Sequence, residues 1–442
     1  MSEEQRTEDD QRQQDGAGHT GFSRRAFLGS LGGAAVGAGA LAAGLKLSSS
    51  TAPVVTGTTF ADAVQSFYGS GRQAGITTAP QQSSTYFAAF DLSSTNRAEV
   101  RDLLREWSDA AANLTAGKPA KPLSTKESAV EPDTGETVGL GPARLEINFG
   151  FGPGLFEKNG EDRYGLRSRR PAALVDLPRF PNDQLVEQTT GGDLTVQACA
   201  DDQQVVFHAV RQLARMASGV ASIRWAQDGF NEAPATSGTP RNLMGFKDGT
   251  INPTTATQQS QFLWVGSEGP SWMRAGTYLV ARRIFIALEH WDSESLSVQE
   301  QVIGRHKLSG APLGEMSEFD ALDLNKTDHS GNPLIPIDAH VRLSAPQNNH
   351  GQMFLRRSYN FYDGVENFTE RWPPWKKELT YNAGLLFMSY QRDPRKGFIP
   401  IFQNLAENDS LGQFTIHTGS LIAAVPPAAT GPEHFVGEGL FA

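Results

Sequence analysis

One histidine in this chain stands in a setting typical of a buried ligand. His340 occurs in the stretch Ile-Asp-Ala-His-Val-Arg-Leu, with apolar residues on both sides and Arg342 two positions later. If this stretch is extended, His340 and Arg342 point to the same side of the chain. A neutral imidazole beside a cation suits a metal ligand near an anionic group. The alternative is a buried histidine that is hydrogen-bonded to a backbone carbonyl.

Two further segments carry side chains suited to acid–base and electrostatic chemistry. Residues 245–250 read Gly-Phe-Lys-Asp-Gly-Thr, in which Asp248 is either a reactive carboxylate or an exposed residue of an Asp-Gly turn. Arg356 and Arg357 lie in the middle of a predicted strand, so alternation should turn one inward and the other outward. An inward arginine on an apolar strand needs an anionic partner, which a salt bridge between domains would also supply.

These segments and several others occur in an order that closely resembles the dye-decolourising peroxidase family, in the exported branch that includes the deferrochelatase-like peroxidases. The resemblance covers most of the chain after the first fifty residues. The matching segments are 148–150, 155–156, 197–202, 224–225, 245–250, 304–307, 338–343, 355–359, 384–387, 390–394 and 417–420.

The resemblance implies a non-covalent haem b, held between loops and the C-terminal half of the chain. His340 is then the proximal iron ligand and therefore the metal-binding residue. Asp248 lies on the distal face, together with Arg356 as the first residue of the arginine pair. Ser358 occupies a position where some relatives carry a distal asparagine, so this chain lacks that amide.

The resemblance also implies residues that surround the cofactor. Leu385 and Phe387 correspond to apolar residues packed over the distal face of haem. Arg342 and Arg305 are candidates for contacts with the haem propionates. A carboxylate hydrogen-bonded to His340 is expected, and the candidates are Asp409 and its competitor Glu407.

The activity implied is the reduction of hydrogen peroxide, coupled to oxidation of bulky dyes, phenols or aromatic amines. Asp248 would move a proton between the peroxide oxygens, while Arg356 would stabilise developing negative charge. Two alternatives are a haem-handling protein that releases iron from haem, as in the deferrochelatases, and a haem-free barrel that binds a small ligand. Electrons from bulky substrates would enter through a surface aromatic residue, for which Tyr359, Tyr390 and Trp375 are candidates, although each could also be an ordinary packed aromatic.

The elements that must position these residues follow from hydrophobic periodicity. The first half predicts the order β-α-β-β-α-β, which is the ferredoxin-like arrangement. Its strands are expected at 85–92, 143–149, 193–200 and 221–227, and its helices at 96–116 and from the Asp201-Asp202 cap through Met216. The second half predicts strands at 277–287, 352–361 and 384–391, and helices at 294–303 and 398–407.

The expected fold class is therefore α+β, with two ferredoxin-like units, antiparallel sheets and peripheral helices, of the dimeric α+β barrel type. The N-terminal domain is predicted at 51–230 and the C-terminal, haem-binding domain at 231–442. Three segments rich in polar and turn-forming residues, 118–136, 230–275 and 317–336, are predicted to be loops.

Residues 1–50 predict a signal peptide for export. Arg24 and Arg25 precede a Gly- and Ala-rich apolar run, which is the twin-arginine type of signal that acts on folded proteins. A membrane anchor is the alternative, because the run has about the roughly 20 residues needed to span a bilayer. The expected partner is the twin-arginine translocation machinery, and the expected location is extracellular, periplasmic or at the cell envelope.

Composition restricts the partners and the cofactor attachment. The net charge of −10 disfavours binding to nucleic acid. The single cysteine, Cys199, allows neither a disulfide framework nor a Cys-x-x-Cys-His attachment of haem. The sequence is compatible with either a monomer or a homo-oligomer.

Overall fold

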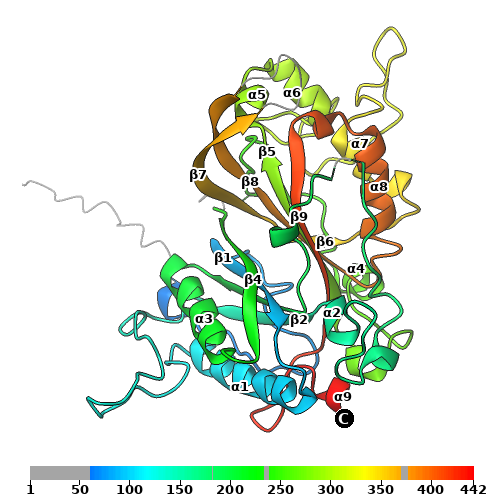
Figure 1. Ribbon diagram of the computed structural model, residues 1–442. Helices are drawn as coiled ribbons and strands as arrows, with labels where there is room; N and C mark the ends of the chain where they lie inside the picture. Colours follow the sequence, from blue (N-terminus) through cyan, green and yellow to red (C-terminus); the bar gives the residue numbers. More distant parts are fainter. Residues whose placement is uncertain (1–59, 182, 233–237, 370–376) are drawn as a thin grey trace, which may run out of the picture. The chain divides into compact units, whose positions relative to one another are not determined.

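The computed structural model describes residues 60–442, except 182, 233–237 and 370–376 (Figure 1). The predicted signal peptide with Arg24 and Arg25, and also Trp375, lie outside the described residues. Residues Gly57–Ala442 form one compact unit. The division into domains after residue 230 therefore stays a prediction. Among the described residues, no helix combines the length and the apolar character that crossing a membrane requires.

The N-terminal half follows the predicted order of elements. The elements are β1 (Ser84–Leu92), α1 (Arg97–Thr115), β2 (Glu146–Phe151), β3 (Leu194–Ala200), α3 (Gln203–Met216) and β4 (Ala221–Phe230). Their antiparallel order is β2-β3-β1-β4. Both helices begin where the side chain of a capping residue binds free backbone N–H groups, Asn96 for α1 and Asp202 for α3.

One boundary in this half differs from the prediction for a physical reason. The predicted strand 143–149 begins only at Glu146. Ala143 and Arg144 have φ angles of 48° and 54°, in the left-handed region that a strand cannot contain. Arg144 is held there by an ion pair of 2.5 Å with Asp201.

The C-terminal half repeats the strand order with different connections. Its strands are β5 (Thr277–Ile286), β6 (Leu355–Arg356), β7 (Tyr359–Thr369), β8 (Lys377–Gln391) and β9 (Thr415–Val425). The antiparallel order is β9-β5-β8-β7, with the short β6 on β8. Its helices are α4 (Ala256–Phe262), α5 (Leu288–Asp292), α6 (Leu296–Ile303), α7 (His340–Ser344), α8 (Phe398–Asn408) and, near the end of the chain, α9 (Glu438–Phe441). The short helix α2 (Pro153–Phe156) belongs to the N-terminal half.

The two halves join into one ring of eight strands. β2 pairs with β9 at Phe151 and Ala424, and β4 pairs with β7 at Phe230 and Asn360. The pairing of β5 with β8 closes the ring, which makes the sheet an antiparallel, barrel-like structure. A large apolar cluster around Trp107 packs α1 and α3 on the N-terminal strands.

The C-terminal half differs from the sequence analysis at three places. The strand expected at 352–361 is interrupted, because Arg357 and Ser358 separate β6 from β7. β9 was not anticipated, although nearly all its residues are buried. The stretch around His340 is the short helix α7 rather than an extended segment, so the alternation argument for Arg342 does not apply.

Candidate functional site

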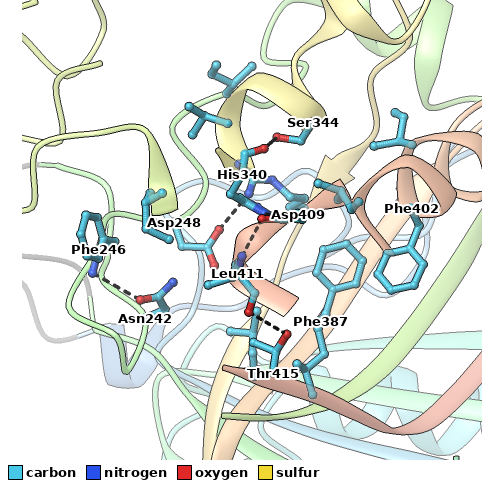
Figure 2. Close-up of a pocket in the computed structure, with 18 of the residues that line it drawn as sticks. Asn242, Phe246, Asp248, His340, Ser344, Phe387, Phe402, Asp409, Leu411 and Thr415 are labelled. Atoms are coloured by element: carbon cyan, nitrogen blue, oxygen red, sulfur yellow. Dashed lines mark hydrogen bonds and ion pairs between the residues drawn. The ribbon is translucent and has the colours of Figure 1, made fainter. Parts of the chain in front are cut away.

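A pocket in the C-terminal half brings together the residues singled out in the sequence. Its lining includes His340 of α7, Asp409 at the end of α8, Asp248 of the 245–250 segment and Arg356 of β6. Figure 2 shows the side chains of His340, Asp248 and Asp409 around this pocket. Most of the remaining wall is apolar, and it includes Ile284, Ile286, Leu385, Phe387 and Phe402.

The imidazole of His340 is oriented by a carboxylate. Its Nδ1 lies 2.6 Å from Oδ2 of Asp409. The other carboxylate oxygen of Asp409 accepts a hydrogen bond of 2.8 Å from the backbone N–H of Leu411. With Nδ1 as the donor to Asp409, Nε2 of a neutral imidazole keeps its lone pair for a ligand bond. Asp409, and not Glu407, makes this contact; the carboxylate of Glu407 binds Gln403 instead.

Asp248 and Arg356 form an ion pair at the same pocket. Nη1 of Arg356 donates to Oδ1 of Asp248 at 3.0 Å, and both side chains are about three-quarters buried. The turn predicted at Asp248-Gly249 is absent, since the turn of this segment lies at residues 243–244, but Gly249 has a φ of +110° that L-residues with a side chain rarely adopt. The backbone N–H of Asp248 also donates to the carbonyl of Pro240 at 2.9 Å. The carboxylate is therefore held in place rather than free in solvent.

The second arginine of the pair has a different role. Arg357 is only 5% exposed, so the expectation that one arginine faces outward was wrong. Its guanidinium donates to the carbonyl of Thr78 and to Gln82, and lies 3.8 Å from Glu146 of β2. The interruption after β6 breaks the alternation and lets both side chains point to buried partners. Arg356 thus faces the pocket, while Arg357 links the two halves of the chain.

The two arginines proposed for propionates are placed differently from each other. Arg305 lines the pocket, but its Nη1 donates to the carbonyls of Gly310 and Glu318. Burial and then the nearby Arg356 lower the pKa of Arg305. Arg342 is not among the residues that line the pocket, and its guanidinium binds the carbonyls of Ile335 and Leu324. The structure therefore does not support Arg342 as a pocket residue.

Sequence reasoning missed a buried carboxylate that holds the Asp248 segment. Glu318 accepts a hydrogen bond of 3.0 Å from the hydroxyl of Thr250, and it also binds Lys247 and Thr239. Burial alone would raise the pKa of Glu318, but the hydrogen bond from Lys247 and those from the two threonines hold it below its usual value. Glu318 lies in the turn-rich segment 317–336, where nothing in the sequence distinguishes it from its polar neighbours.

His417 was also missed, because no local partner is visible in the sequence. It is buried, lines the pocket and has Nδ1 3.4 Å from Nε of Arg282. Burial, followed by the charge of Arg282, lowers the pKa of His417 well below its usual value, so the ring is neutral. Arg282 is itself fully buried and paired with Asp183.

Two of the three aromatic residues proposed for surface oxidation are not at the surface, and the third, Trp375, lies outside the described residues. Tyr359 and Tyr390 are completely buried. Burial raises the pKa of both phenols, so both carry their protons at neutral pH. Neither can meet a bulky substrate directly, and this part of the prediction was wrong.

The residues present fit a haem group. Apolar walls suit a flat macrocycle, and a carboxylate-bound histidine suits an axial ligand. Among the described residues, no group of three or more His, Cys, Asp or Glu side chains is arranged to hold a metal ion by itself. The imidazole of His340, bound to a carboxylate in a largely apolar pocket, is thus better matched to iron that arrives inside a macrocycle than to a bare ion.

Comparison with known proteins identifies the class. Models for the N-terminal and C-terminal parts of Dyp-type peroxidases match residues 73–231 and 239–430. A dye-decolorizing peroxidase from Thermobifida fusca is 36% identical over 440 residues, which cover 93% of this chain and 96% of the relative. The deferrochelatase of Escherichia coli K12 is 35% identical over 352 residues, which cover 77% of this chain and 79% of the relative.

Solved structures agree with this result. Ferric DtpA from Streptomyces lividans has 39% sequence identity and a TM-score of 0.77, covering 87% of this chain and 99% of its own. The chain therefore belongs to the Dyp-type peroxidase family. It is a haem-dependent peroxidase, an oxidoreductase that acts on hydrogen peroxide and a reductant.

Proposed function

We propose that this peroxidase holds haem b through His340, uses Asp248 and Arg356 as its distal pair, and oxidises bulky dyes, phenols or aromatic amines. One observation carries the proposal. A single apolar pocket contains a carboxylate-bound histidine and, separately, an aspartate–arginine ion pair. These are the groups needed to hold haem iron and to activate peroxide.

Each residue has a definite task in this proposal. Haem, when bound, supplies the redox-active iron centre. Asp409 accepts the Nδ1 proton of His340 in a hydrogen bond, which fixes the ring and increases the basicity of Nε2. Asp248 accepts a proton from one peroxide oxygen and returns it to the other, which leaves as water. Arg356 stabilises the negative charge that develops on peroxide as the O–O bond breaks.

The proposal is tested by optical spectra before and after one equivalent of peroxide. The holoprotein should change its haem spectrum rapidly, and Asp248→Ala or Arg356→Leu should slow that change by about 10²–10⁴-fold and 10²–10³-fold respectively. His340→Ala should lose haem. If His340→Ala kept its full haem content and an unchanged spectrum, the ligand assignment would be wrong. Slow bleaching of the wild type without a rapid phase would contradict the peroxidase mechanism.

Release of iron from haem is a second candidate. The similarity to the Escherichia coli deferrochelatase favours it. The test is to add a reductant to the holoprotein and measure chelatable iron together with the porphyrin spectrum. Free iron accompanied by intact porphyrin would support this activity, and iron that stays bound to porphyrin would exclude it.

We also infer that each half is a ferredoxin-like unit. In both halves the strand order is fourth, first, third and second, and helices follow the first and third strands, which supports this fold. Expression of residues 231–442 alone, followed by circular dichroism and thermal melting, tests whether that half is an independent domain. Light scattering of the intact protein would decide between a monomer and a homo-oligomer.

Export of the folded, haem-loaded protein through the twin-arginine route is a further part of the proposal. The Arg24-Arg25 pair and the apolar run that follows it support this route. Non-covalent haem makes early loading advantageous, because no attachment reaction is left for the outside. Replacing both arginines by lysine should retain the protein in the cytoplasm, as judged by cell fractionation. Unchanged export would contradict the route.

A further inference from the structure

Arg356 lies on β6, a strand of two residues that is hydrogen-bonded on both of its edges, to β8 on one edge and to a single side chain on the other. On one edge β6 runs beside β8, where Leu355 and Arg356 face Tyr390 and Ser389. The next residue, Arg357, donates its backbone N–H to the carbonyl of Met388 on that same strand. The backbone N–H and C=O of Arg356 itself point to the other edge, where no strand of the described chain is paired with β6.

A single side chain satisfies both of these backbone groups. The N–H of Arg356 donates to Oδ1 of Asn252 at 2.9 Å, and Nδ2 of Asn252 donates to the carbonyl of Arg356 at 3.0 Å. The carboxamide thus takes the place that a peptide group of a neighbouring strand would occupy. A carboxamide offers a donor and an acceptor side by side in this way.

Asn252 also belongs to the segment that carries Asp248. It follows Asp248 by four residues, beyond Gly249, whose φ is +110°. The segment is anchored at Asp248 by Pro240 and at Thr250 by Glu318. One short loop therefore contacts Arg356 twice: a carboxylate binds its guanidinium, and an amide binds its backbone.

From this geometry we infer that Asn252 is a positioning residue for peroxide activation. It holds the backbone of Arg356 in register with Asp248, so that the guanidinium and the carboxylate keep a constant relation at the pocket. The inference rests on the proposed function of the Asp248–Arg356 pair. A misplacement of about 1 Å in such a group can reduce a rate about 10²-fold.

We call the two hydrogen bonds between the Asn252 amide and the backbone of Arg356 the clamp. The cavity next to it explains why it matters. A second, polar cavity lies beside the first, and both Asn252 and Arg356 contribute to its wall. Without the amide, water can enter from this cavity and bind the freed N–H and C=O of Arg356. The hydrogen bonds would be replaced, but the connection between the loop and β6 would be lost. The expected damage is therefore to position rather than to stability.

The first test is Asn252→Ala in the full-length holoprotein. We expect the second-order rate constant for peroxide to fall about 10- to 100-fold. The turnover number at saturating peroxide, with a reductant that limits the rate, should stay near that of the wild type. Haem content and melting temperature should also be retained. Independently of activity, deuterium exchange at the backbone amide of Arg356 should become faster, because its N–H loses a fixed partner.

Asn231→Ala is the matched control. Asn231 lines the same polar cavity and makes one long contact of 3.5 Å to the carbonyl of Ser358, but it contacts neither Arg356 nor Asp248. We expect peroxide rates and exchange at Arg356 close to those of the wild type. Equal losses in Asn231→Ala and Asn252→Ala would show a general effect of the cavity and would overturn the inference.

Asn252→Asp supplies a rescue that depends on pH. An ionised aspartate can accept from the N–H of Arg356 but repels its carbonyl, whereas a protonated aspartate can donate to that carbonyl as well. The ratio of the Asn252→Asp rate to the wild-type rate should therefore rise as pH falls through the pKa of the new carboxyl. A ratio independent of pH would count against the two-bond clamp.

Failure of the role inferred for Asn252 and failure of the proposed peroxidase mechanism give different results. If the wild type reacts slowly with peroxide, the peroxidase mechanism fails, while faster exchange at Arg356 in Asn252→Ala would still support the clamp. If the wild type reacts rapidly, and Asn252→Ala matches it in both rate and exchange, the clamp is contradicted and the mechanism stands.

Discussion

The two halves of the barrel share a strand order, but one face of the sheet is covered by a packed helix in the N-terminal half and borders a pocket in the C-terminal half. In the N-terminal half, a regular helix, α1, follows the first strand and packs Leu104 and Trp107 into a cluster with Val196 and Ala198 of the third strand. In the C-terminal half, the chain between β5 and β6 contains only short helices, and the third strand presents Leu385 and Phe387 to a pocket.

The difference shows that the same strand order can support either a hydrophobic core or a ligand pocket. A long amphipathic helix fills the face of a sheet, which stabilises the fold but leaves no space for a ligand. Short helices joined by irregular segments leave that space, and one of them, α7 (labelled in Figure 1), begins with His340, which lines the pocket. Substitutions should therefore affect mainly stability in the first half and mainly chemistry in the second.

The largest effect on stability is expected for Trp107→Ala. Trp107 is fully buried, and its indole N–H donates to the carbonyl of Leu213 at 2.8 Å. The substitution should reduce the free energy of unfolding by about 3–5 kcal/mol, as measured by denaturant titration. The haem spectrum of the protein that remains folded should not change. A large spectral change without destabilisation would contradict the contrast between the halves.

Glu318→Gln should have the next largest effect on the free energy of unfolding, because Glu318 binds the segment that carries Asp248. It removes the charge that Lys247 binds, and the cost should be about 1–3 kcal/mol at neutral pH. Because the pKa of Glu318 is below its usual value in the folded protein, its contribution is present above the usual glutamate pKa of about 4.3 and is lost as pH falls through the lower folded value.

The measurement for Glu318 is therefore a pair of unfolding titrations across acid pH. The difference in stability between the wild type and Glu318→Gln should shrink as pH is lowered below about 4. A difference that stays constant through this range would mean that the carboxylate charge contributes nothing. The surface substitution Glu127→Gln, in an exposed loop of the N-terminal half, is the matched control.

Asp409→Asn should act on chemistry rather than on stability. The amide cannot fix the ring of His340 as an ionised acceptor does, so haem affinity or the peroxide rate should fall about 10- to 100-fold. Haem titration of the apoprotein and peroxide mixing would measure these two quantities. Glu407→Gln, two residues earlier on α8 and bound to Gln403 rather than to His340, should leave both unchanged.

The smallest effect is expected for Asn96→Ala at the start of α1. The side chain of Asn96 accepts from the backbone N–H of Ala98, and loss of such a cap costs about 1 kcal/mol. Thermal unfolding should detect the loss, and the peroxide rate should match that of the wild type. A changed peroxide rate would imply coupling between α1 and the pocket, which would weaken the comparison.

The sequence alone predicted the regular elements of the N-terminal half and the residues to which a role in the reaction is proposed. The N-terminal strands and helices followed from periodicity and from the cap signal at Asp201-Asp202, since these signals act over a few residues. His340, Asp248 and Arg356 were recognised from motifs, and the structure places all three at one pocket.

Only the tertiary structure decided how those residues are held. The choice of Asp409 over Glu407 depends on a contact across 69 residues, and the Asp248–Arg356 pair on one across 108. The contacts of Glu318 with Thr250 and of Asn252 with Arg356 likewise reach across 68 and 104 residues. Hydrogen bonds between segments far apart in the chain leave no periodic signal, because their geometry exists only after the barrel has closed.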